Sequence, residues 1–164
     1  MLNSKKIIAA FAFATIASTG AAHAASVTAS ASATIATPIA ISQTAALDFG
    51  SVSASATAGT AVLSTTGGLT VTGGVGALGG LPSAAAFSVS GQAGSTYAIT
   101  LPTTATLSSG VNSMTITGFA HSAGLTPALT TGTSSFNVGA TLNIAASQVA
   151  GAYSGTYAVT VNYN

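Results

Sequence analysis

Large apolar residues alternate with small polar ones along much of this chain. The clearest stretch lies at its end, where one face carries Tyr153, Gly155, Tyr157, Val159, Val161 and Tyr163. The opposite face carries Ser154, Thr156, Thr160 and Asn162. Because successive side chains of a β-strand point to opposite faces, this period of two predicts one long, half-buried strand over residues 153–163.

The same alternation recurs elsewhere and predicts further strands. Phe136, Val138, Ala140, Leu142 and Ile144 form one series, and shorter series occupy the odd positions of 97–101, 87–89 and 69–71 and the even positions of 114–116. Between residues 25 and 41 the apolar side chains again fall at odd positions, with Pro38 at a break or an edge position. A flexible Ala/Ser/Thr/Gly-rich linker has no reason to keep this periodicity, so we expect strands.

No window shows the 3.6-residue apolar spacing of an amphipathic helix, and Glu and Arg, which favour helices, are absent. About eight or more short strands separated by turns favour an all-β, antiparallel β-sandwich over one flat sheet. With so much alanine, we expect the space between the sheets to be filled by a few large residues: Phe49, Phe87, Tyr97, Phe119, Phe136, Tyr153 and Tyr157.

The first 24 residues have the composition of a secretory signal peptide. Lys5 and Lys6 precede an apolar run over 7–17, and Ala22-His23-Ala24 offers the small residues of a cleavage site. We therefore expect cleavage after Ala24, a single β-sandwich domain over 25–164, and export to the periplasm, cell surface or medium. No later run reaches the roughly 20 apolar residues of a transmembrane helix, so none is expected in the mature chain.

Charge is almost absent, which narrows the chemistry. Lys and Arg together number two, Asp and Glu one, and Cys is missing. Nucleic-acid binding through a basic surface, metal or other cofactor binding, and catalysis are therefore not expected. Asp48 beside Phe49-Gly50 is interpreted as a turn cap, and His121 as exposed on a loop or a strand edge. A Ser-His-Asp triad stays open by residue count alone, but no G-x-S-x-G motif supports it.

Residues 74–79 read G-V-G-A-L-G, which matches the glycine spacing of dinucleotide-binding loops. Gly79, Gly80 and Pro82 stand where the helix of such a motif should begin, and no acidic residue follows. We therefore interpret this stretch as a flexible glycine-rich loop.

Three motifs carry a family resemblance: Phe49-Gly50-Ser51, the stretch from Phe136 to Leu142, and the ending from Gly151 to Tyr163. Together they resemble the bacterial secreted family called domain of unknown function 4402. More distantly, the ending is similar to spore coat protein U and to the archaic chaperone-usher pilins.

The pilin resemblance implies an immunoglobulin-like sandwich that lacks one strand and is completed by an extended segment of a neighbouring subunit. On this chain the donor face would be Val27, Ala29, Ala31, Ala33 and Ile35. The groove would be bordered by Tyr153, Tyr157, Val159, Val161 and Tyr163. In the alternative arrangement, residues 25–35 form the first strand of their own domain.

The leading hypothesis is a noncatalytic structural subunit of a surface fibre or coat, with other copies of the chain or a periplasmic chaperone as its partners. A self-contained adhesin or carbohydrate-binding module, acting through loops such as Gly67 to Gly80, is the alternative. A functional amyloid is a third hypothesis, because low charge and β-propensity favour cross-β stacking.

Overall fold

The computed structural model describes residues 24–164, so the predicted signal peptide lies outside the described residues except for Ala24. The chain divides into two units, residues 1–34 and 35–164. Within the described residues there is no helix, and the predicted all-β, antiparallel sandwich is confirmed. The strands are β1 Ala40–Ala45, β2 Ser51–Ser53, β3 Gly59–Leu63, β4 Leu69–Gly73, β5 Gly76–Gly79, β6 Ala85–Ser90, β7 Tyr97–Thr100, β8 Thr104–Ser109, β9 Asn112–His121, β10 Thr133–Ile144 and β11 Thr160–Tyr163.

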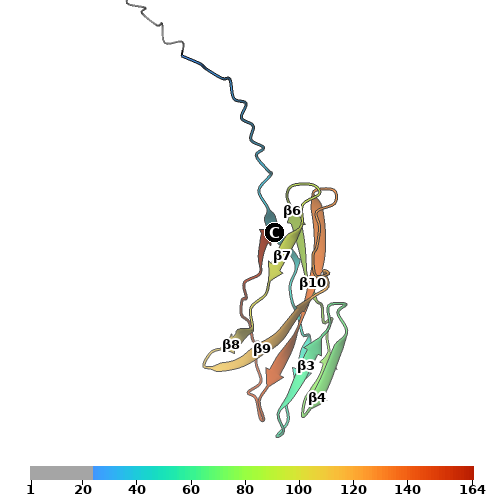
Figure 1. Cartoon of the computed structure of the whole chain (residues 1–164). Helices are drawn as coiled ribbons and strands as arrows, with labels where there is room; N and C mark the ends of the chain where they lie inside the picture. The colour runs from blue at the N-terminus through green and yellow to red at the C-terminus, as the bar shows by residue number, and fades with distance from the viewer. Residues whose placement is uncertain (1–23) are drawn as a thin grey trace, which may run out of the picture. The chain divides into compact units, whose positions relative to one another are not determined.

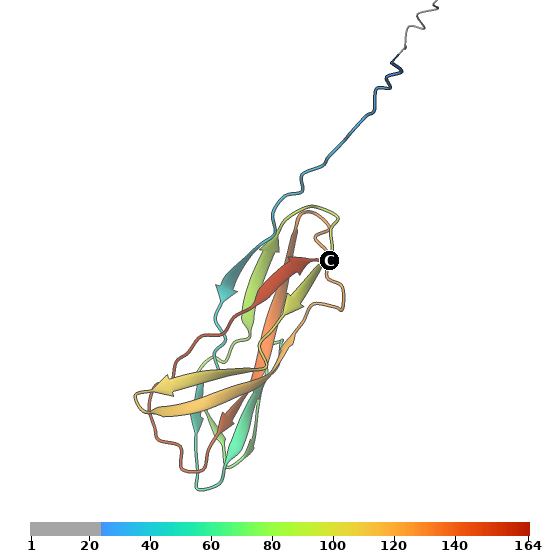
Figure 2. The same cartoon turned by 60° about the vertical axis from the view of Figure 1, so that its left-hand side comes forward.

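A seven-stranded antiparallel sheet is organised around β10 (Figure 1). One edge of β10 pairs with β6 over residues 133–138 and then with β3 over 140–144, while β9 pairs with the opposite edge over 138–143. β1 extends the sheet beyond β6, β4 extends it beyond β3, and β8 extends it beyond β9. Figure 2 shows β8 and β9 as a yellow hairpin that crosses in front of β10.

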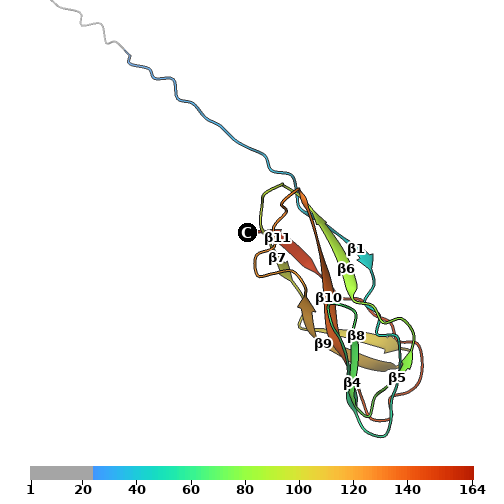
Figure 3. The ribbon, with the colours of Figure 1, turned by 90° about the vertical axis from the view of Figure 1, so that its right-hand side faces the viewer.

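Two short antiparallel pairs, β7–β11 and β2–β5, complete the domain (Figure 3). Tyr97 of β7 and Val161 of β11 belong to one buried cluster with Phe87 of β6 and Phe136 of β10. The rings of Phe87 and Phe136 are stacked, with centroids 5.4 Å apart. A second cluster joins the inner faces of β3, β9 and the end of β10 to Phe49. The sheets therefore pack face to face through apolar side chains.

The alternation predicted for the inner residues matches the structure well. Buried and more exposed positions alternate along β6, and Phe136 of β10 is buried between two exposed neighbours, Ser135 and Asn137. Among the large residues expected in the core, Phe49, Phe87, Tyr97 and Phe136 are buried. The other three, Phe119, Tyr153 and Tyr157, are partly buried against the two clusters.

Three predictions about the extent of strands are wrong. Residues 24–39 belong to no strand, and β1 begins only at Ala40. The long strand expected over 153–163 is reduced to Thr160–Tyr163. Residues 76–79, expected in a flexible loop, form β5 and pair with β2. The reason is common to all three, because a strand exists only where a second strand accepts its backbone hydrogen bonds.

Candidate functional site

The segment that carries the predicted donor face, residues 25–35, forms no strand in the structure. Figure 1 shows it as an extended blue trace. Val27, Ala29, Ala31, Ala33 and Ile35 are all exposed, and Val27 and Ile35 are 91% and 96% exposed. An extended segment with apolar side chains on every second residue has the pattern of a strand that lacks its sheet.

The domain is tied at Thr37 to the end of its last strand. The Tyr163 hydroxyl donates a hydrogen bond to the Thr37 carbonyl oxygen over 2.7 Å and accepts one from the backbone N–H of Gln92 over 2.6 Å. The Thr37 N–H donates to Oε1 of Gln92 over 3.2 Å. We call these three residues the Tyr163 joint. The sequence placed Tyr163 on an inner face, but nothing in it indicated Gln92 or Thr37 as partners.

The predicted groove residues lie along the chain that leads into β11. Val161 is buried in β11, and Tyr153, Tyr157, Val159 and Tyr163 are half-buried. The even positions between them are exposed, so the predicted inner face is confirmed for these five residues, whereas Gly155 is exposed and the long strand is absent. Only residues 160–163 pair with a strand, β7, and Ser154 forms an isolated bridge with Ser108 of β8.

Between that bridge and β11 the backbone has no partner. Residues 155–159 belong to no strand or bridge, and no backbone hydrogen bond reaches them from the described part of the chain. We call this stretch the open segment. Unpaired N–H and C=O groups in extended chain are a template for an added strand.

A small apolar hollow adjoins the open segment. Its volume is about 40 Å³. Leu47 and Phe49, which follow β1, line it together with residues 155–157 of the open segment. Apolar side chains of β8 and β9 complete the lining: Ala105, Leu107 and Ile116. The hollow has room for a small apolar group and offers no charge.

Tyr157 has an unusual position at this hollow. Its ring packs on Phe119 with centroids 5.1 Å apart, and its hydroxyl is buried without a hydrogen-bond partner among the described residues. Burial raises the pKa of the phenol above its ordinary value of 10.0. Tyrosine hydroxyls usually find a partner when buried, so this one is a polar group that the described part of the chain leaves unsatisfied.

Asp48 and His121 make different contacts in the structure. Oδ1 of Asp48 accepts a hydrogen bond from the N–H of Gly50 over 2.7 Å, and Gly50 has a φ of 68°, so the predicted turn cap is confirmed. His121 is half-buried with its ring edge against Phe136, so its expected exposure is wrong. No hydrogen bond joins His121 to Asp48 within residues 24–164. The part of the chain that the structure describes also contains no cluster of three or more His, Cys, Asp or Glu side chains.

The glycine-rich stretch from Gly67 to Gly80 is mostly strand. β4 occupies residues 69–73 and β5 occupies residues 76–79, with a short connection between them. It is therefore not the long recognition loop that the adhesin hypothesis expected.

Residues 24–164 contain no helix with the length and hydropathy that a membrane span requires.

Comparison with known proteins places the chain in a family. No curated protein and no solved structure matches the chain. A family model described as "Domain of unknown function (DUF4402)" matches residues 39–163, which begins just before β1 and ends with β11. The chain therefore belongs to the DUF4402 family.

Proposed function

We propose that this protein is an exported, noncatalytic structural subunit that assembles into a surface fibre or coat by strand donation. The observation that carries the proposal is the pair of complementary features in one chain. Residues 25–35 present apolar side chains on alternate positions without a sheet, and the open segment presents unpaired backbone beside an apolar hollow.

The open segment is long enough to pair with part of the donor face. Five residues of extended chain span about 17 Å, so the open segment pairs with about five residues of a donor. A donor of that length places two or three alternate side chains on the inner face. Alanine and valine side chains suit a hollow of about 40 Å³ better than large aromatic ones do. We expect the Ala29–Ala31–Ala33 part of the donor face to lie over the hollow.

Charge also supports assembly between copies. Residues 25–35 contain no charged side chain, and the hollow has none in its lining. Two such surfaces approach without electrostatic repulsion and without stripping water from ions. A net charge near zero favours association of the whole molecule. The export signal predicted over residues 1–24 is consistent with assembly outside the cytoplasm, where a periplasmic chaperone would cover the groove first.

The test compares the chain from residue 25 with a variant that lacks residues 25–35. We expect the first to form oligomers or fibres, seen by light scattering and electron microscopy, and the second to remain a folded monomer. A synthetic peptide of residues 25–36 should raise the melting temperature of the deletion variant, and a scrambled peptide should not.

A matched pair of double variants controls for composition. Ala29→Asn with Ala33→Asn changes the part of the donor face that is expected over the hollow and should abolish assembly. Ser30→Asn with Ser32→Asn changes the opposite face of the same stretch and should leave assembly intact. A monomer in which the amide hydrogens of residues 25–35 are protected from exchange would show pairing within one chain and would overturn donation between copies.

A further inference from the structure

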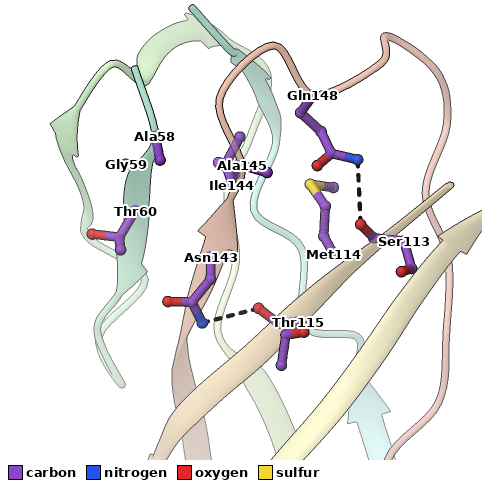
Figure 4. A pocket seen from close by; sticks show the side chains of 10 residues that line it. All are labelled: Ala58, Gly59, Thr60, Ser113, Met114, Thr115, Asn143, Ile144, Ala145 and Gln148. Atoms are coloured by element: carbon purple, nitrogen blue, oxygen red, sulfur yellow. Dashed lines mark hydrogen bonds between the residues drawn. The ribbon is translucent and has the colours of Figure 1, made fainter. Parts of the chain in front are cut away.

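An open hollow of about 510 Å³ lies where β10 leaves the large sheet (Figure 4). Asn143 of β10 pairs with Thr115 of β9 and with Thr60 of β3, and β10 ends one residue later at Ile144. Beyond that point β9 continues to Asn112 without β10 beside it. The departing strand therefore leaves a gap that the loop after β10, which carries Gln148, borders from above (Figure 4).

Two amide side chains at this hollow are held in fixed orientations. Nδ2 of Asn143 donates to the carbonyl oxygen of Thr115 over 3.0 Å and to Oγ1 of Thr117 over 2.9 Å. Nε2 of Gln148 donates to the carbonyl oxygen of Ser113 over 3.3 Å and to the hydroxyl of Tyr153 over 2.8 Å. Since a backbone carbonyl can only accept, each amide must direct its nitrogen to it.

The amide oxygens are consequently left as acceptors. Within residues 24–164 no hydrogen bond reaches Oδ1 of Asn143 or Oε1 of Gln148. In Figure 4 the Asn143 oxygen points toward Thr60, and the Gln148 oxygen points away from Ser113, on the side of Met114. The hydroxyls of Thr60, Ser113 and Thr115 add groups that both donate and accept, and the Thr60 hydroxyl already shares one hydrogen bond with Oγ1 of Thr72 over 2.7 Å.

The rest of the lining is apolar and the whole of it is uncharged. Met114 and Ile144 are buried beneath the opening, and Ala58 and Ala145 flank it. An ionic ligand would find no countercharge here. A neutral sugar matches this lining. Its hydroxyls donate to the two amide oxygens and accept from threonine and serine, and its C–H groups pack on the methionine. The volume lies within the range of small-molecule sites.

The outer face of the sheet carries further uncharged hydrogen-bonding side chains beside the hollow. Strand pairing aligns Thr106, Thr115, Asn143, Thr60 and Thr72 in one row across β8, β9, β10, β3 and β4. Four strand spacings make this row about 19 Å long. A row of uncharged hydrogen-bonding groups that continues from the hollow suits a chain of sugars better than a single one.

We propose that this hollow and its row bind a neutral oligosaccharide. No residue of 25–35 or of the open segment lines the hollow, so the proposal is independent of strand donation. A subunit with such a site would attach an assembly to a polysaccharide surface. The site also differs from the glycine-rich stretch that the sequence suggested for this role.

The test is an NMR titration of the chain from residue 25, kept monomeric by the Ala29→Asn and Ala33→Asn changes, with cellotetraose, maltotetraose and mannotetraose. We expect at least one of them to shift the amide signals of residues 58–60, 113–115 and 143–148. A tetragalacturonate, which carries charge, should bind at least tenfold more weakly. Absence of shifts with all three neutral sugars, or shifts confined to other residues, would overturn the proposal.

Matched variants then locate the site. Thr60→Val with Thr115→Val removes two lining hydroxyls and should weaken binding at least tenfold, while Thr70→Val with Thr104→Val, on the same face outside the hollow, should change it less than twofold. Ala145→Ile narrows the hollow and should weaken binding, whereas Ala146→Ile should not. Equal binding by both members of either pair, with unchanged melting temperatures, would contradict the assignment.

Discussion

Gly139 is a residue whose replacement should disturb the large sheet directly. It is buried in β10, between the residues that pair with β6 and those that pair with β3. A Cβ at this position would collide with the backbone carbonyl oxygen of Leu63, which cannot move as a side-chain tip can. We expect Gly139→Ala to lower the free energy of unfolding by about 1–3 kcal/mol, measured by urea denaturation.

Gly124 provides the matched control for this substitution. A Cβ there meets nothing within 4 Å, and its backbone does not need a positive φ. Gly124→Ala should leave the free energy of unfolding unchanged or raise it by about 0.4–1 kcal/mol, because alanine restricts the unfolded chain. Equal stability of the two variants would show that β3 and β10 are not packed as closely as described.

Among the elements, β11 matters because its last tyrosine holds the entry to β1. Tyr163→Phe removes the hydroxyl of the Tyr163 joint and leaves Thr37 and Gln92 without that partner. We expect a loss of about 1–3 kcal/mol in the free energy of unfolding. The Gln92 amide should also exchange with deuterium faster.

Tyr157→Phe is the control for the joint, since the hydroxyl it removes is buried and has no partner within the described residues. This variant should be as stable as the parent or slightly more stable near neutral pH. A Tyr163→Phe variant with the stability of Tyr157→Phe, and with unchanged exchange at Gln92, would contradict the joint.

At the scale of the whole molecule, stability should respond weakly to pH and salt. From residue 25 onward the only carboxylate side chain is Asp48 and the only histidine is His121. We expect the free energy of unfolding to change by less than about 1 kcal/mol between pH 7 and 4. Shortening the Debye length from about 30 to about 8 Å with NaCl should hardly move the melting temperature. A steep fall in melting temperature toward pH 4 would contradict this.

At alkaline pH the free energy of unfolding should begin to depend on pH. Burial raises the pKa of Tyr157 above 10.0, so the unfolded chain loses this proton at a lower pH than the folded chain. The unfolded state then binds fewer protons, and the free energy of unfolding falls as the pH rises past 10. Tyr157→Phe should reduce that fall, as measured by urea denaturation at successive pH values.

The alternating pattern predicted which side chains face inward more reliably than it predicted strands. Along 153–163 it identified Tyr153, Tyr157 and Val161 as inner residues, and they are. It could not show that residues 155–159 lack a partner strand. The short strands β2, β3 and β8 were missed because residues such as Gly59 and Thr104 give only a weak apolar period.

The hollow at the end of β10 had no signal in the sequence. It exists because β9 continues beyond the level at which β10 and β3 both end, and because two amides, Asn143 and Gln148, are fixed by backbone carbonyls. Their residue types are ordinary for a polar surface. Only the pairing register brings them to one place.

By itself, the sequence determined that this chain is a nearly uncharged all-β protein and which side chains face its core, because burial follows from side-chain chemistry and from the period of two. Tertiary structure alone decided which stretches of extended chain have partners. Residues 25–35 and 153–159 carry the same alternation as β10, but a strand depends on hydrogen bonds supplied by chain far away in the sequence. Those long-range pairings also placed the Tyr163 joint, the open segment and the hollow.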